Sequence, residues 1–90
     1  MRPAIDFPGE RPRKRSVLAG AHQTSISLED QFWSFLKDLA KTTGHSTNEL
    51  VALVDGARPQ STLSSALRVF CLEVAMGKRA VPVAPIRGGK

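Results

Sequence analysis

The stretch HQTSISL, residues 22–28, decides the fold of this chain. Polar and apolar residues alternate along it, which is the period of an extended strand with one buried face and one solvent-facing face. The polar face holds Gln23, Ser25 and Ser27, and the opposite face holds Thr24, Ile26 and Leu28. We therefore predict a β-strand over residues 22–28.

This strand needs a partner, because one strand makes no sheet and even an isolated hairpin is only marginally stable in water. The chain offers no second run of comparable alternation, although the short apolar run over residues 16–20 is able to extend the strand or lie beside it. We therefore expect the strand to pair antiparallel with its own copy in a second subunit, which satisfies its backbone N–H and C=O groups. The expected core of this dimer comprises Thr24, Ile26, Leu28, Phe32, Trp33 and Leu36.

Helical spacing of apolar residues begins directly after the strand and continues through three segments. These segments predict helices over residues 29–43, 47–57 and 62–76. Gly44 is the expected stop of the first helix, and Ser46 with Glu49 forms a capping box that starts the second. The expected fold class is therefore mainly α with one short N-terminal strand, and residues 17–76 form the expected folded domain.

Basic residues gather at the two ends of the chain, which has a formal net charge of +5. Residues 1–16 are rich in Pro and Arg and are expected to be a disordered basic arm. Residues 77–90 are expected to be an extended basic tail, whereas the domain between them holds more acidic than basic residues. Basic arms on a nearly neutral body favour a polyanionic partner, and the alternative is that they only aid solubility.

The composition argues against several classes of protein. The one cysteine, Cys71, lies in an apolar run, which indicates a buried thiol in a reducing compartment and no disulfide framework. No apolar stretch approaches the ~18 residues of a membrane span, and the polar N-terminus is unlike a signal peptide. His22 and His45 lack a metal-ligand spacing with Cys71, and no nucleophile or phosphate-loop motif is present. We expect a cytoplasmic, nucleoid-associated protein that is not an enzyme and uses no metal or cofactor.

The order of strand, helix, glycine turn and capped helix resembles a ribbon-helix-helix domain. Residues 24–28 look like the strand of the Arc/MetJ-type repressors, and the Gly-x-Ser-x-Asn run over residues 44–48 resembles the turn between their two helices. Over about residues 14–75 the chain is similar to a bacterial subfamily of small ribbon-helix-helix proteins with an added third helix. It departs from that subfamily at residues 21–23, where Ala-His-Gln replaces an expected Gly-His-Arg, and the missing arginine weakens a contact with phosphate or guanine.

The resemblance implies an intertwined homodimer that places a shared two-stranded ribbon in the major groove of double-stranded DNA. The polar face of the ribbon would read bases through Gln23, Ser25 and Ser27, and the Gln23 amide is suited to bidentate bonding with adenine. The start of the second helix would bind a phosphate through free N–H groups, and the basic arm would lie beside the duplex. The implied phosphate-binding residues are Ser46, Thr47, Asn48, Arg11, Arg13, Lys14 and Arg15.

Each of these sites also has a plainer interpretation. By composition alone, the polar face of the strand is more typical of an ordinary solvated surface than of a DNA-reading one. Ser46 caps a helix whether or not it binds phosphate. The missing partner strand favours the DNA-binding interpretation, and our leading hypothesis is a dimeric, sequence-specific transcriptional regulator. The alternative is a protein-interaction module, antitoxin-like or structural, which binds another protein through the helix over 62–76 or through the C-terminal tail.

Overall fold

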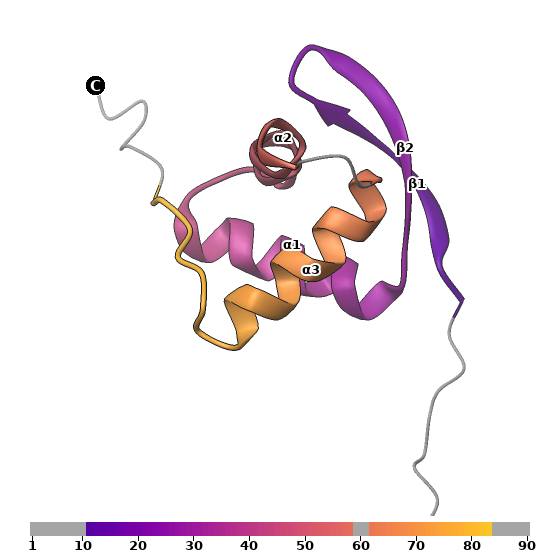
Figure 1. Ribbon diagram of the computed structural model, residues 1–90. Helices are drawn as coiled ribbons and strands as arrows, with labels where there is room; N and C mark the ends of the chain where they lie inside the picture. Colours follow the sequence, from indigo (N-terminus) through magenta and orange to yellow (C-terminus); the bar gives the residue numbers. More distant parts are fainter. Residues whose placement is uncertain (1–10, 59–61, 84–90) are drawn as a thin grey trace, which may run out of the picture.

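The computed structural model describes residues 11–58 and 62–83, and shows a two-stranded antiparallel sheet followed by three helices (Figure 1). The elements are β1 (Arg13–Ala19), β2 (His22–Leu28), α1 (Asp30–Thr43), α2 (Thr47–Ala57) and α3 (Leu63–Ala75). The expected class, a ribbon-helix-helix fold with an added C-terminal helix, is confirmed. The outer parts of the expected basic arm and tail, residues 1–10 and 84–90, lie outside the described residues.

The presence of β1, which precedes β2 in the chain, contradicts the expectation of a single strand. It pairs antiparallel with β2 inside the same chain, with Ala19 opposite His22 beside the turn and Arg13 opposite Leu28 at the far end. Gly20 opens the turn with a φ of 69°, and a tight type II′ hairpin turn places glycine at this position. The expectation that residues 13–16 belong to a disordered arm is therefore wrong. Because β1 of the same chain already pairs with β2, β2 no longer needs a second copy as its partner strand.

β1 forms because its second half alternates in the same way as β2. Val17 and Ala19 are buried, whereas Ser16 and Leu18 between them are exposed. The two buried side chains lie on the face of the hairpin that packs against the helices, as Ile26 and Leu28 do on β2. The charged residues 13–15 therefore belong to the same strand as residues 16–19, which alternate between exposed and buried. By composition alone, residues 13–15 are typical of a solvated arm.

The hydrophobic core lies between the inner face of the hairpin and the three helices. Its largest fully buried side chains are Ile26, Leu28, Leu36, Leu50, Val51 and Leu67. Three residues that were expected in a dimer core, Ile26, Leu28 and Leu36, are thus buried in the core of one chain. Phe32 and Trp33 are partly buried and pack against this core, and Thr24 is half-buried.

The helix ends follow the local chemistry of the sequence. Gly44 ends α1 in a left-handed conformation with a φ of 79°, which glycine adopts without steric cost. Ser46 and Glu49 form the capping box of α2, with the Glu49 N–H donating to Ser46 Oγ at 3.0 Å and the Ser46 N–H donating to Glu49 Oε1 at 2.8 Å. Thr62 caps α3 by accepting the N–H of Ser65. The helices start and stop within one residue of the expected ranges because these signals are local.

Side chains of α2 and α3 bind both edges of the hairpin. On β1, the Leu18 N–H donates to Asn48 Oδ1 at 3.3 Å, and on β2, the Ser27 N–H donates to Ser64 Oγ at 3.0 Å. Arg68 also donates to the Ser27 carbonyl at 3.1 Å. In an antiparallel ladder, opposed residues alternate between pairs that hydrogen-bond to each other and pairs whose N–H groups point away from the partner strand. Leu18 and Ser27 belong to pairs of the second kind, because their N–H groups donate to side chains of α2 and α3. The hairpin is therefore fixed between α2 and α3.

The buried thiol of Cys71 gives a first testable prediction. Burial on α3 raises the pKa of the Cys71 thiol from 9.0 to about 11, because a thiolate is poorly solvated in an apolar site. Since only the thiolate is nucleophilic, the reactive fraction at pH 8 falls roughly 100-fold, a factor of ten for each pKa unit. We expect a disulfide reagent to label native Cys71 at least that much more slowly than Cys71 of the chain in denaturant. Equal rates in the two conditions would contradict the buried position.

Candidate nucleic-acid interface

The hairpin of β1 and β2 lies against one side of the helices (Figure 1). Its outward face, which points away from the helices, carries six side chains. They form three cross-strand pairs, Lys14–Ser27, Ser16–Ser25 and Leu18–Gln23. All are exposed except Ser27, which is half-buried where α3 binds the edge of β2. The three residues expected to read bases therefore share one face, and β1 adds three more that sequence reasoning did not place there.

The basic residues of β1 are divided between the two faces of the hairpin. Arg15 lies on the inner side, donates to Asp30 at 2.6 Å, and stacks over the Trp33 ring at 4.8 Å. Arg13 is 67% exposed and also lies 3.4 Å from Asp30. Lys14 points outward, and within the described residues it makes no ion pair. Of the three β1 cations expected to bind phosphate, only Lys14 thus lies on the outward face. Arg11, the fourth expected cation, precedes β1.

The half-buried position of Arg15 has an electrostatic basis. Its Nε is buried without a hydrogen-bond partner among the described residues, which is a cost in an apolar environment. The Asp30 carboxylate and the negative face of the Trp33 ring offset that cost through charge pairing and a cation–π contact. Arg15 therefore anchors β1 to the start of α1. Its charge is already paired with Asp30 and Trp33 of the same chain.

A second ionic contact connects the end of β2 with α3. Arg68 Nε donates to Glu29 Oε1 at 3.0 Å, and its guanidinium lies over the Phe32 ring at 6.0 Å. The hydrogen bond from Arg68 lowers the pKa of Glu29 below its usual value, because it favours the charged carboxylate. Together with the Arg68 contact to the Ser27 carbonyl, this pair fixes the junction between the ribbon and the helices.

The N-terminus of α2 lies beside β1 and is the second element of the interface. Its capping box already occupies the N–H groups of Ser46 and Glu49. No hydrogen bond within the described residues occupies the N–H groups of Thr47 and Asn48, which belong to the first turn of the helix. The Asn48 side chain is bound to the edge of β1 at Leu18. A helix N-terminus with free N–H groups attracts anions, and here it lies next to the hairpin.

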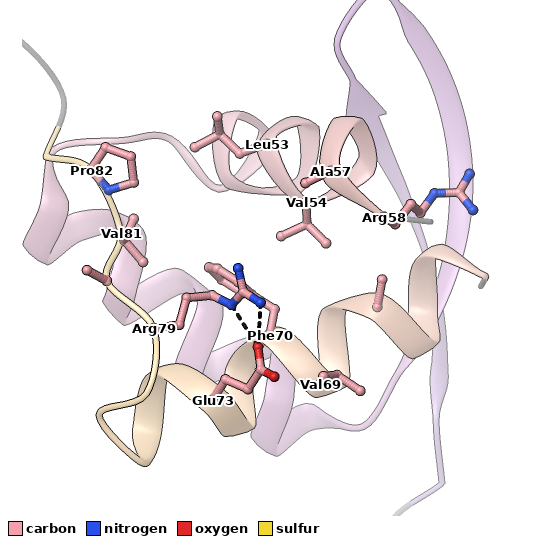
Figure 2. A pocket seen from close by; sticks show the side chains of 12 residues that line it. Leu53, Val54, Ala57, Arg58, Val69, Phe70, Glu73, Arg79, Val81 and Pro82 are labelled. Carbon is pink, nitrogen blue, oxygen red and sulfur yellow. Dashed lines mark hydrogen bonds and ion pairs between the residues drawn. The ribbon is translucent and has the colours of Figure 1, made fainter. Parts of the chain in front are cut away.

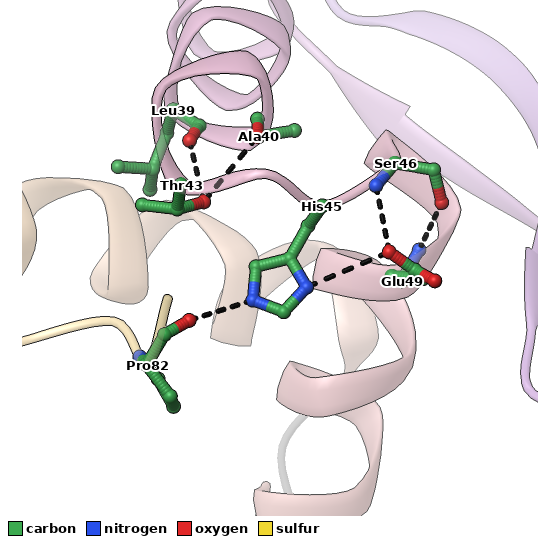
Figure 3. Close-up of polar contacts among 7 residues, drawn as sticks. All are labelled: Leu39, Ala40, Thr43, His45, Ser46, Glu49 and Pro82. Carbon is green, nitrogen blue, oxygen red and sulfur yellow. Dashed lines mark hydrogen bonds and ion pairs between the residues drawn. The ribbon is translucent and has the colours of Figure 1, made fainter. Parts of the chain in front are cut away.

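The segment after α3 returns to this helix start through His45 (Figure 3). His45 Nε2 lies 2.7 Å from the Pro82 carbonyl, and Nδ1 lies 3.5 Å from Glu49 Oε1. Arg79 pairs with Glu73 of α3 at 2.7 Å. Part of the expected extended tail is therefore held against the helices. The His45–Pro82 contact joins residues 37 positions apart, and the Arg79–Glu73 pair is local.

The same segment closes one side of an apolar hollow of about 270 Å³ between α2 and α3 (Figure 2). Leu53 and Val54 of α2, Val69 and Phe70 of α3, and Val81 contribute apolar walls. The Arg79–Glu73 pair lies at its rim. The hollow lies among the helices, and none of the six outward side chains of the hairpin lines it.

The described part of the chain has neither a cluster of side chains arranged for a metal ion nor a helix able to span a membrane. No group of three or more His, Cys, Asp or Glu side chains in this part of the chain is arranged to hold a metal ion. None of the helices within residues 11–58 and 62–83 is long and apolar enough to cross a membrane.

Comparison with known proteins identifies the family to which the chain belongs. A model of the ribbon-helix-helix domain matches the chain over residues 12–75. Searches of curated proteins and of solved structures found no match. Ribbon-helix-helix domains are DNA-binding modules, typically without enzymatic activity. Since the match covers both strands and all three helices, this chain belongs to the ribbon-helix-helix domain family.

Proposed function

We propose that the protein binds double-stranded DNA in a sequence-specific manner, with the outward face of the hairpin in the major groove. The observation that carries the proposal is that Gln23, Ser25 and Ser27 share this face with the outward cation Lys14. The major groove is about 12 Å wide and admits a two-stranded ribbon. The paired serines at the centre are short, which allows the backbone of the ribbon to come close to the bases. The proposed cellular role is transcriptional regulation at the nucleoid, in the cytoplasm.

The N-terminus of α2 is proposed to bind a phosphate of the same duplex. The free N–H groups of Thr47 and Asn48 support this role, and the Ser46 cap holds the helix start in place. Arg11 and Arg13 are exposed at the start of β1 and are proposed to contact further phosphates. Arg15 is a weaker candidate, because Asp30 neutralises it. These contacts would position the ribbon without selecting a sequence.

We further propose that the protein acts as a homodimer. Dimerisation is typical of this family, and two copies would present two hairpins to an inverted repeat in DNA. The pairing of β1 with β2 leaves other surfaces to form the interface. Val69, Leu72 and Met76 on and beside α3 are each more than half exposed, and we propose that a second copy covers them. Sedimentation equilibrium at micromolar concentrations tests this, and a monomer throughout would contradict it.

The test of DNA binding is a fluorescence-anisotropy titration of labelled random-sequence duplex at increasing salt. Because phosphate contacts release counterions, we expect log Kd to rise linearly with log salt concentration, with a slope of about 0.9 for each phosphate neutralised. Unlabelled duplex should compete for the protein, whereas an acidic polypeptide of equal charge should compete less well. Absence of duplex binding at low salt would overturn the proposed function.

A second candidate function, a protein-interaction module, is favoured by the same exposed apolar side chains of α3. In that case another protein covers α3, and the hairpin face has no role. The two functions are separated by substituting Ser25, on the outward face of the hairpin, with Glu. This change weakens duplex binding if the hairpin reads DNA, and it leaves duplex binding unchanged if α3 is the functional surface.

A further inference from the structure

β1 changes what the proposed DNA-reading face is made of. In the expected dimer, both strands of the ribbon were copies of β2, so that the face would carry two sets of Gln and Ser. In the hairpin, the second strand is β1, and the face gains a cation and an apolar side chain. Lys14 lies opposite Ser27 near one end of the hairpin, and Leu18 lies opposite Gln23 near the turn. The face is therefore chemically different at its two ends.

We propose that Lys14 and Leu18 of β1 determine sequence specificity, with Lys14 selecting guanine and Leu18, together with Gln23, selecting an A·T pair. This inference rests on the proposed function, namely insertion of the hairpin in the major groove of a B-form duplex. The proposed bound molecule is duplex DNA, because the face has the width of a two-stranded ribbon, carries a cation and contains no carboxylate.

The environment of Lys14 fits base contact. Arg13 and Arg15, its neighbours in sequence, are drawn to Asp30 beside the inner face, which leaves Lys14 as the cation on the outward face. The residue opposite is Ser27, whose short side chain does not block the path to a base edge. In the major groove, guanine presents the acceptors O6 and N7, which a lysine ammonium binds as a donor. Adenine presents a donor in place of O6 and is disfavoured.

The environment of Leu18 fits an A·T pair. Leu18 is 46% exposed and is the one large apolar side chain of the outward face. Its cross-strand partner is Gln23, whose amide is suited to bond adenine N6 and N7. The thymine of that base pair presents its methyl group in the same groove, where an aliphatic side chain makes apolar contact. Cross-strand neighbours lie about 5 Å apart at Cβ, so both side chains reach one base pair.

The register also gives the spacing of the two preferences. Lys14 and Leu18 are separated by four residues of β1, which is about 13 Å along an extended strand. Successive bases rise about 3.4 Å along the helix axis. A ribbon that follows the groove would therefore place the preferred guanine three or four base-pair steps from the preferred A·T pair.

The experiment is selection of binding sites from random duplex DNA by the full chain, followed by affinity measurements on the selected duplex. Wild-type protein should enrich a G·C and an A·T position at the stated spacing. Lys14→Ala should flatten the preference at the G·C position, with a loss of about 5-fold to 100-fold on the selected duplex and less on mismatched duplexes. Lys37→Ala, which removes an exposed cation of α1 that is no part of the hairpin, should leave the preference unchanged.

Modified bases identify the atoms involved. Replacing the selected thymine with deoxyuridine removes only its methyl group, and this should weaken binding severalfold for the wild type but not for Leu18→Ala. Replacing the selected guanine with 7-deazaguanine should weaken binding by the wild type but not by Lys14→Ala. Circular dichroism of the variants shows that they fold, as expected for exposed positions.

The outcomes separate this inference from the proposed function. If Lys14→Ala weakens all duplexes equally and lowers the salt slope by about one, Lys14 binds phosphate and the inference is overturned while DNA binding stands. If neither Lys14→Ala nor Leu18→Ala changes the base preferences of the protein, the inference is likewise overturned while DNA binding stands. If the wild-type chain binds no duplex at all, the proposed function itself fails, and the inference fails with it.

Discussion

Replacing Ser25 with Glu is expected to lower the affinity for duplex DNA about 100-fold. Ser25 is exposed at the centre of the outward face, opposite Ser16 on β1. A carboxylate at this position would enter a groove lined by base acceptors and flanked by phosphates, and like charges brought together at an interface cost several kcal/mol. A cost of about 3 kcal/mol corresponds to roughly a factor of 100 in Kd. Anisotropy titrations of the same duplex at fixed salt measure the difference.

The matched control is Ser34→Glu, which adds the same charge at an exposed position of α1. This variant should lose only a few-fold in affinity, through the change in net charge. Both variants should keep the helical circular-dichroism spectrum, because neither replaced side chain is buried. Equal losses for the two variants would mean that net charge alone controls binding. No loss for Ser25→Glu would remove the hairpin face from the site.

Much of this fold was predictable because its signals are local. The capping box of Ser46 and Glu49, the glycine stop at Gly44 and the alternation of residues 22–28 each specify an element within a few residues. β1 was not predicted, because Arg13, Lys14 and Arg15 have the composition of a solvated arm. The signal that could have found it is the two-residue interval with glycine first, residues 20–21, between two alternating runs.

The sequence predicted which side chains of the site share a face, but it did not predict which of its cations are available to DNA. Alternation alone brings Gln23, Ser25 and Ser27 to one face, and the hairpin has them there. Whether a cation of β1 is available to DNA depends on Asp30 and Trp33, which approach Arg15 only in the folded chain. The bond between Asn48 and the β1 edge is likewise tertiary, since 30 residues separate its partners. Sequence patterns report the orientation of side chains along one element, and pairing between elements requires the fold.

Replacing Leu28 with Ala is expected to lower the free energy of unfolding by about 2–5 kcal/mol. Leu28 is completely buried where β2 leads into α1, in the core shared by the hairpin and the helices. The substitution removes apolar contacts and leaves a cavity that the surrounding side chains fill only in part. Against a typical total stability of about 5–15 kcal/mol, this is a large fraction. Urea unfolding followed by circular dichroism measures the loss.

The dependence on protein concentration shows where Leu28 acts. In the core of one chain, the stability difference between wild type and Leu28→Ala is the same at every concentration. Leu72→Ala makes the same chemical change at a side chain of α3 that is 57% exposed, and in a monomer it should change stability by no more than about 0.5 kcal/mol. If a second copy covers α3, Leu72→Ala lowers the unfolding midpoint only at concentrations where copies associate. A Leu28→Ala loss that vanishes on dilution would instead return Leu28 to an interface between subunits.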